Sequence, residues 1–431
     1  MLVILFSIYL VLQDQSLSGR VARLDPELST RLRATVGRLA DAQLRRDRIE
    51  VEKIAREAIA LLGDQAGLPE TADRPLEIPR DSQPLETLEL RRSFRPYLDR
   101  LEREKWWRKG LDPTKTNHAA REAAAVIEGC LGAAEVDDEI RDRCLALARD
   151  AADYLIWTQD RAGSGVFPFP AVRRGRGRPF EVAERFLERA ESEGRIHEMV
   201  RNGWIFEDLG DGGLKFDNGR AGVALFHLHA RSRDPELLRA ARRSADWAVE
   251  RPCVPNWNYN AFSTELLAEA FSATQDPRYL AAAKRELRLG LLPGRLEVGP
   301  RRGRWADPHN ARPAYHYIMV RALVVLLRVL PANDPDRGAV IEAIRDALNA
   351  RNLDVARSLV AVDPAIEAFV AIESLDAADR SRFAGTSIDE ALESLERYAS
   401  SGIRSGRPRV GPGAWGAWIG RRGSPLRSPS E

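Results

Sequence analysis

The sequence predicts an all-α protein made of successive helical hairpins. Apolar residues recur with a helical period along most of the chain, whereas stretches with the alternating pattern of a β-strand are nearly absent. The segments 223–241 and 265–283 repeat one another, because in each an apolar helix is followed by Asp-Pro and then by a second helix. Their Asp-Pro pairs begin at residues 234 and 276, so the repeat is 42 residues long. A repeat of this length is typical of stacked helical hairpins.

Asp-Pro pairs mark where the returning helices begin. Asp is a good cap for a helix N-terminus and Pro is tolerated at the first helical position, so Asp234-Pro235, Asp276-Pro277 and Asp334-Pro335 each predict a sharp helix start. The expected β structure is one small hairpin that pairs Gly203–Phe206 with Leu214–Phe216. The predicted helices of the central region span residues 117–131, 138–158, 180–193, 218–232, 235–250, 261–273, 277–290, 314–330 and 336–350.

Composition divides the chain into four parts. Residues 1–18 hold an apolar run that is too short to span a bilayer and fits a signal peptide or an anchor, so we expect no stable membrane span and a secreted or cell-envelope protein. Residues 19–90 predict a charged amphipathic helix and a Pro-rich linker. Residues 91–399 hold the helical hairpins. Residues 400–431, rich in Gly, Pro, Ser and Arg, predict a low-complexity and mostly disordered tail, whose two tryptophans dock on the folded part.

Charge and missing motifs exclude several classes of function. The 66 Lys and Arg residues against 64 Asp and Glu give a net charge of +2, which leaves no broad basic surface for nucleic acid. Cys130, Cys144 and Cys253 lack metal-ligand spacing, so we expect no metal site. The chain has no Walker loop, no GxGxxG after a strand, no HExxH and no GxSxG. Nucleotide hydrolysis, dinucleotide redox chemistry and zinc proteolysis are therefore disfavoured, and we expect no cofactor.

The hairpins resemble those of the six-hairpin, (α/α) toroid carbohydrate-active enzymes. Residues 152–155 (ADYL) and 245–248 (ADWA) lie near the ends of returning helices and are similar to the outer helices of that superfamily. The Gly219-x-x-Gly222 opening of an inner helix and the xDPxxLxxA return are similar too. The resemblance covers residues 117–350 and implies an (α/α) toroid with a carbohydrate substrate. Glycosidases, polysaccharide lyases, unsaturated glucuronyl hydrolases and sugar epimerases share this architecture, so the resemblance alone does not choose the reaction.

Loops that precede the inner helices of such a toroid lie at one end of it, and here they are rich in aromatic and polar residues. The opposite turns are short and plain. Function concentrates on loops held by a rigid scaffold, so the loop-bearing end is the predicted functional face. Flat sugar faces stack on Trp and Tyr, while Asn side chains bond the hydroxyls. The predicted substrate-binding residues are Trp204, Trp257, Asn258, Tyr259, Asn260 and Trp305.

The loop at 304–317 holds the residue types that β-elimination on a uronate needs. Arg or Asn neutralises the carboxylate, His takes the α-proton, and Tyr protonates the leaving oxygen. Toroid alginate lyases and related polysaccharide lyases are similar in using these types. The favoured interpretation is a polysaccharide lyase that acts on an acidic polysaccharide or oligosaccharide. Its predicted catalytic residues are His309 or His316 as base, Tyr315 or Tyr317 as acid, and Arg312 with Asn310 on the carboxylate.

Three alternatives stay open beside elimination. A glycoside hydrolase needs two carboxylates across the bond, and Asp217 with Asp307 is the best pair because each precedes an inner helix between aromatic residues. A sugar epimerase needs two bases, which His118 with His309 or His316 would supply. A helical-repeat scaffold or sugar-binding protein would use the same aromatic residues without catalysis, on an open superhelix.

Overall fold

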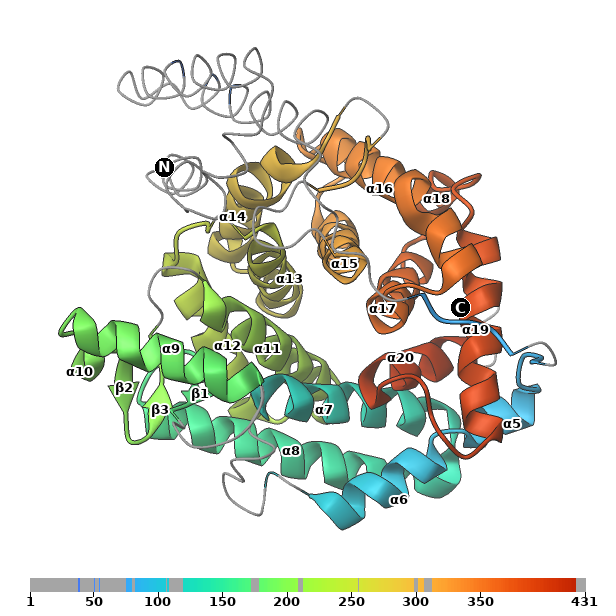
Figure 1. The fold of residues 1–431 in the computed structure, drawn as a ribbon, viewed down its shortest axis with the longest axis horizontal. Helices are drawn as coiled ribbons and strands as arrows, with labels where there is room; N and C mark the ends of the chain where they lie inside the picture. The colour runs from blue at the N-terminus through green and yellow to red at the C-terminus, as the bar shows by residue number, and fades with distance from the viewer. Residues whose placement is uncertain are drawn as a thin grey trace.

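Helices arranged in two concentric rings make up the fold (Figure 1). Within the described residues, six helices form the inner ring. Neighbours along the chain are in contact, and the last inner helix contacts the first, so the ring is closed and the predicted (α/α) toroid is confirmed. The computed structural model describes residues 38, 50, 54, 75–79, 82–105, 107, 119–171, 178–207, 212–254, 256–297, 301–305 and 312–423. The inner helices are α7 (Ala119–Val136), α11 (Gly213–Ser232), α13 (Trp257–Thr274), α15 (Pro313–Val329), α17 (Val362–Glu373) and α20 (Pro412–Arg422).

The outer ring alternates with the inner one along the chain (Figure 1). Short elements fill the connections: α5 (Thr87–Arg92), η2 (Asp138–Ile140), α9 (Arg178–Ser192), α10 (Ile196–Met199), η3 (Leu287–Leu291), η4 (Leu292–Gly294) and α18 (Ala377–Ser381). The outer helices are α6 (Arg95–Glu104), α8 (Arg141–Ala162), α12 (Pro235–Glu250), α14 (Pro277–Glu286), α16 (Arg337–Ser358) and α19 (Ile388–Arg404).

Two of the three Asp-Pro pairs cap helices as predicted. The Asp234 side chain accepts from the Glu236 amide at 2.8 Å, and Asp276 accepts from the Arg278 amide at 3.0 Å. Each caps the outer helix that begins at the following Pro. The third pair forms a turn before α16 instead, in which the Asp334 side chain accepts from the Asp336 amide.

A small antiparallel sheet replaces the predicted hairpin. Strand β3 (Trp204–Ile205) lies between β1 (Phe169–Pro170) and β2 (Val200–Arg201). Residues 214–216, expected to pair with Gly203–Phe206, instead form the first turns of α11, so that prediction is wrong. Gly212, with φ of 79°, is the residue before this helix and takes a backbone conformation that few other residues tolerate.

The C-terminal region completes the ring, which corrects the predicted boundary at residue 399. Residues 400–423, expected to be a low-complexity tail, form the end of α19, a turn and the inner helix α20. Trp415 and Trp418 are buried, and the Trp415 indole donates to Ser93 Oγ at 2.9 Å. Residues 424–431 lie outside the described part of the chain.

Glycines allow α20 to pack directly on α7 at the point where the ring closes. A Cβ on Gly132 of α7 would lie 1.9 Å from the carbonyl oxygen of Gly416, and a Cβ on Gly416 would lie 2.3 Å from the Cα of Gly129. The two backbones therefore touch where no side chain fits. Composition indicated disorder here, whereas the same glycines serve close packing.

The segment before the ring follows its outer surface. The Leu76 amide donates to the Ser358 carbonyl at the end of α16, and the Leu85 amide donates to Ser400 Oγ. The region predicted to be a linker up to residue 90 already includes the start of α5. Residues 1–18 and most of the predicted N-terminal helix lie outside the described residues. No helix of the described part has the length and apolar character that crossing a membrane requires.

Candidate functional site

Connections at the two ends of the ring differ in length, as predicted. Long connections join Ala162 to Gly213 and Glu286 to Pro313, at the end where the inner helices begin. At the other end, two residues separate Ser232 from Pro235 and Thr274 from Pro277. We call the first of these the loop end.

The Asn256–Asn260 cluster lies in the wall of the ring, where every residue except Tyr259 is buried. Asn260 Nδ2 donates to the carbonyls of Val254 and Gly290, while its Oδ1 accepts from the Val254 amide and from Lys215 Nζ. Asn258 is 1% exposed and donates to the Asn256 side chain. We predicted ligand contacts because buried amides need partners, and for Asn260 the structure supplies these partners from the backbone and from Lys215. Asn258 Oδ1, in contrast, is buried without a hydrogen-bond partner among the described residues.

The tryptophans predicted to stack on sugar are buried too. Trp257 is 4% exposed and packs against Gly294, and Trp305 is 3% exposed and donates from Nε1 to the Leu291 carbonyl. Trp204, in β3, is 3% exposed and meets Trp157 of α8 edge to face. None of these three indoles presents a free face to solvent.

His316 and Tyr317 lie inside the wall as well. His316 Nε2 bonds the Ala347 carbonyl at 3.0 Å, and its ring packs against Trp305 and Tyr317. Burial, with the nearby Arg351 cation, holds the pKa of His316 well below its ordinary value. The Tyr317 hydroxyl donates to Asn352, and burial raises the pKa of this phenol.

Arg121 holds Asp217, the first member of the proposed hydrolase pair. Nε and Nη2 of Arg121 donate to its two carboxylate oxygens at 2.8 Å each, and Asp217 is 2% exposed. Arg121 also lies over the ring of Phe216. The side chain of the neighbouring Glu122 is exposed at the surface. Desolvation nevertheless raises the pKa of Glu122 to about 7, a shift that the Arg121 cation opposes and the Asp217 carboxylate increases.

Three other predicted residues lie at the loop end with partly exposed side chains. Tyr259 is in the first turn of α13, Tyr315 is in the first turn of α15, and Arg312 immediately precedes α15. Helices α13 and α15 are neighbours in the ring. The remaining predicted residues lie outside the described part of the chain: His118, Asp307, His309 and Asn310.

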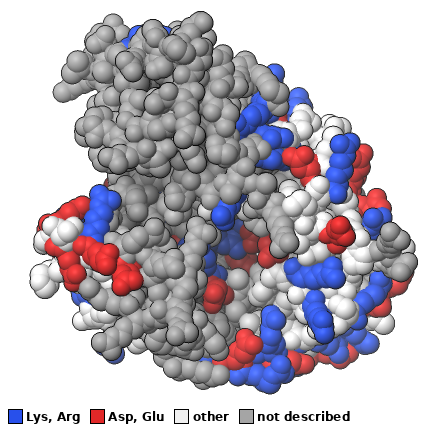
Figure 2. Space-filling model, viewed as in Figure 1, with Lys and Arg blue, Asp and Glu red and all other residues white. Residues whose placement is uncertain are grey.

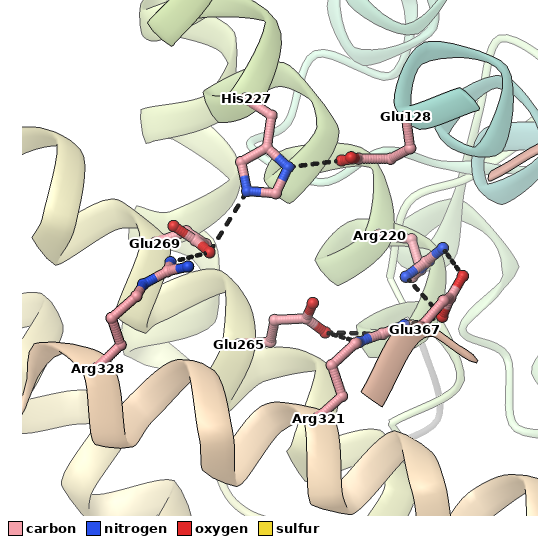
Figure 3. A network of polar contacts seen from close by, with 8 residues as sticks. All are labelled: Glu128, Arg220, His227, Glu265, Glu269, Arg321, Arg328 and Glu367. Atoms are coloured by element: carbon pink, nitrogen blue, oxygen red, sulfur yellow. Dashed lines mark hydrogen bonds and ion pairs between the residues drawn. The ribbon is translucent and has the colours of Figure 1, made fainter. Parts of the chain in front are cut away.

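A second cluster, which the sequence did not lead us to expect, lines the lumen of the ring (Figure 3). His227 of α11 bonds Glu128 of α7 at 2.8 Å and approaches Glu269 of α13 at 3.4 Å. Arg328 of α15 pairs with Glu269. Deeper in the lumen, three further ion pairs join Arg321 to Glu265, Arg321 to Glu367, and Arg220 to Glu367. We call these eight residues the lumen network.

The lumen network surrounds a cavity of about 200 Å³, whose apolar lining includes Val223, Val325 and Val370. Side-chain exposure rises from 5% at Arg321 to 36% at Arg328 and 38% at His227. The last two residues lie toward the C-terminal ends of their helices, so the most exposed part of the lumen network lies away from the loop end.

Neighbouring opposite charges shift the pKa values of three residues of the lumen network, His227, Glu269 and Glu128. Burial opposes a charged His227, but the carboxylates of Glu128 and Glu269 outweigh this and hold its pKa well above the ordinary value. Burial likewise opposes a charged Glu269, but His227 and Arg328 lower its pKa to about 2. The pKa of Glu128 is also lowered, against burial, by His227 and Arg220. The eight side chains pair with one another through the ion pairs described above, which suits a structural role.

A sequence signal for the lumen network did exist. Glu265 and Glu269 lie four residues apart in an otherwise apolar helix, and Arg321 and Arg328 lie seven apart in another. Such spacings place each pair on one helix face. Because charges rarely enter apolar surroundings unpaired, the two acidic and two basic positions predict a buried ionic layer.

The described surface offers no strong single-sign field on the face seen in Figure 2. Acidic and basic side chains are interspersed over that face, including its centre. Among the described residues, no group of three His, Cys, Asp or Glu side chains could hold a metal ion. The cysteines are free, with Cys130 and Cys144 buried.

Comparisons place the chain beside carbohydrate enzymes of similar fold. No protein-family model matches the sequence, and no curated protein sequence matches it significantly. Similar solved structures include a polysaccharide lyase, with 10% identity and a TM-score of 0.46 over 78% of this chain and 96% of that one. A family 88 glycosyl hydrolase from Bacteroides vulgatus has 13% identity and a TM-score of 0.44, covering 78% of this chain and 98% of that one. An unsaturated glucuronyl hydrolase from Streptococcus agalactiae has 12% identity and a TM-score of 0.44, covering 83% and 97%.

Proposed function

We propose that this chain is a carbohydrate-active enzyme that acts on an acidic glycan at the loop end of the ring. One observation carries the proposal: the closed ring places Arg312, Tyr315 and Tyr259, all partly exposed, at the starts of two neighbouring inner helices. A guanidinium fits the carboxylate of a uronate, and phenols fit both stacking and proton transfer. The long connections that belong to this end would complete the site.

We favour β-elimination as the reaction. Arg312 and Asn310 would neutralise the uronate carboxylate, so that the proton on the adjacent carbon becomes acidic. Of the two candidate bases, His309 is preferred, because Nε2 of His316 already bonds the Ala347 carbonyl inside the wall. Tyr315 is the preferred acid for the same reason, since the Tyr317 hydroxyl donates to the buried Asn352. The α-proton would pass to His309, and the leaving oxygen would take a proton from Tyr315.

Hydrolysis is the second candidate, and Glu122 is the observation that favours it. A carboxyl group with a pKa of about 7 is protonated often enough near neutral pH to act as a general acid. The base would have to be another carboxylate, and Asp307 would serve better than Asp217. Both oxygens of Asp217 accept from Arg121, which weakens it as a base.

An activity screen with two readouts tests the proposal. The full chain is incubated with polyuronides, sulfated glycans and neutral glycans, and both new reducing ends and the ultraviolet absorbance of an unsaturated uronate are followed. We expect both signals on a polyuronide, and loss of both in Arg312→Ala. Reducing ends without absorbance, lost in Glu122→Gln, would replace elimination by hydrolysis. If neither new reducing ends nor ultraviolet absorbance is found on any glycan, an enzymatic role is contradicted.

A further inference from the structure

An exposed tryptophan lies on the outer wall near the loop end. Among the described residues, four large apolar side chains are exposed, and Trp157 is the aromatic one, with 45% of its surface accessible. It belongs to the penultimate turn of α8, whose C-terminal end leads into the long connection to α11. An indole has a large apolar face and a polar N–H group, so an exposed indole beside the predicted functional face is suited to contact a ligand.

Trp157 is held in place by other aromatic rings. Its centroid lies 5.9 Å from that of Trp204, with the two rings at 82°, and 6.0 Å from that of Tyr154. Trp204 is itself anchored in β3, the central strand of the small sheet. Trp204, which we predicted to stack on sugar, therefore supports Trp157, and the exposed indole is the one that can meet a ligand. A ring fixed by its neighbours loses little conformational freedom on binding.

A cation accompanies the exposed indole. The Arg161 guanidinium lies 5.7 Å from the centroid of the Trp157 ring, and Arg161 is exposed. No carboxylate in the described ranges pairs with Arg161, and the adjacent Asp160 pairs with Arg243 at 2.8 Å instead. Asn202 donates to the Arg161 carbonyl, which fixes this end of α8 against the sheet. An uncompensated guanidinium beside an aromatic face suits a ligand that is both flat-sided and anionic.

We propose that Trp157 and Arg161 form a binding platform for an acidic polysaccharide on the outer wall. The apolar face of a sugar ring would stack on the indole, and the carboxylate of that sugar or its neighbour would pair with Arg161. The choice of ligand class rests on the proposed function. The platform binds the polysaccharide without acting on it. Because Trp157 and Arg161 lie where α8 leads into the connection to α11, the bound polysaccharide is held next to the loop end.

Retention by polymers tests the platform. The full-length protein is run through native gels that contain polygalacturonate, alginate or a neutral β-glucan, and the mobility shift gives the affinity. We expect Trp157→Ala to weaken affinity for the polyuronides about fivefold or more, and Arg161→Gln to weaken it for polyuronides but not for the glucan. The matched control is Leu353→Ala, which removes another exposed apolar side chain, on α16, and should change nothing. Because Trp157 is exposed, the melting temperature of its variant should stay close to that of the wild type.

Turnover of a short soluble substrate separates the platform from the proposed function. Normal turnover with lost polymer retention in Trp157→Ala supports both. Retention that depends on Trp157, without turnover of any glycan, supports the platform and rejects the enzyme. Turnover with equal retention of Trp157→Ala and Leu353→Ala overturns the platform and leaves the enzyme standing. The platform is likewise overturned if no polymer retains the wild type, or if Trp157→Ala affects only binding of a protein or of lipid vesicles.

Discussion

The Nδ1 atom of His227 lies 2.8 Å from a carboxylate oxygen of Glu128, on the neighbouring inner helix. Its Nε2 atom lies 3.4 Å from Glu269, so one imidazole ring links α7, α11 and α13 across the lumen (Figure 3). The lumen network contains four Glu and three Arg residues besides this histidine. The cluster is therefore neutral only when His227 carries a proton, which ties the stability of the ring to pH.

His227 should stabilise the ring most in mildly acidic solution. Its folded-state pKa is raised above the ordinary 6.5, so its contribution is fully present below pH 6.5 and is lost as pH rises through the raised value. The pKa of Glu269 is lowered from 4.5 to about 2, so its contribution is present above pH 4.5 and is lost as pH falls toward 2. Urea unfolding of wild type and His227→Gln should differ most between pH 4.5 and 6.5. His229→Gln, which removes a contact to the Asp234 carbonyl, is the control, and a difference that grows toward alkaline pH would contradict the assignment.

Removing one partner of a buried ion pair should destabilise the fold strongly. Lys215 Nζ lies 3.1 Å from a carboxylate oxygen of Glu286, and the two side chains are 2% and 0% exposed. Lys215→Met leaves the Glu286 charge without its partner and should cost about 3–5 kcal/mol of unfolding free energy. The double variant Lys215→Met with Glu286→Leu should regain most of that loss. Denaturant titration measures both, and a single variant as stable as wild type would show that the pair is not formed.

The contact between α7 and α20 should not tolerate a methyl group. A Cβ on Gly132 would lie 1.9 Å from the Gly416 carbonyl oxygen, so Gly132→Ala must push α20 away and should cost about 1–3 kcal/mol or more. Gly338 of α16 has open space around its Cβ position, and Gly338→Ala should be neutral or stabilising by up to about 1 kcal/mol. Equal melting temperatures for the two variants would contradict closure of the ring through α20.

Local sequence signals predicted the ring helices between residues 117 and 350, but they predicted neither α6, α17, α19 and α20 nor the closure of the ring through α20. Helix α12 has its predicted bounds because Asp234 caps it and Pro235 starts it. Helix α11 begins five residues before its predicted start at 218, since Leu214 and its neighbours fit a strand pattern as well as a first turn. The Gly-rich sequence of α20 has the composition of a disordered tail. Its order comes from contact with α7, which is distant in sequence.

Residue types predicted the candidate site less well, because type does not reveal which way a side chain points. Asn260 and Trp305 have the chemistry of sugar ligands, but the same hydrogen-bonding capacity holds backbone carbonyls inside the wall. Arg312 and Tyr315 lie at the predicted end, partly exposed. The sequence analysis did not select Glu122, since nothing in its sequence neighbourhood indicates that desolvation and, to a smaller extent, Asp217 raise its pKa.

The most direct test of the account compares the two ends of the ring in one kinetic measurement. On the polyuronide that the wild type degrades, kcat/KM is measured for Arg312→Ala at the loop end and for His227→Gln in the lumen, at a temperature where both variants are folded. If the reaction takes place at the loop end, Arg312→Ala should lose about 100-fold or more, as expected for removal of a charge-stabilising group, while His227→Gln stays within about twofold. A large loss in His227→Gln with near-normal turnover in Arg312→Ala would contradict the account and move the active site into the lumen.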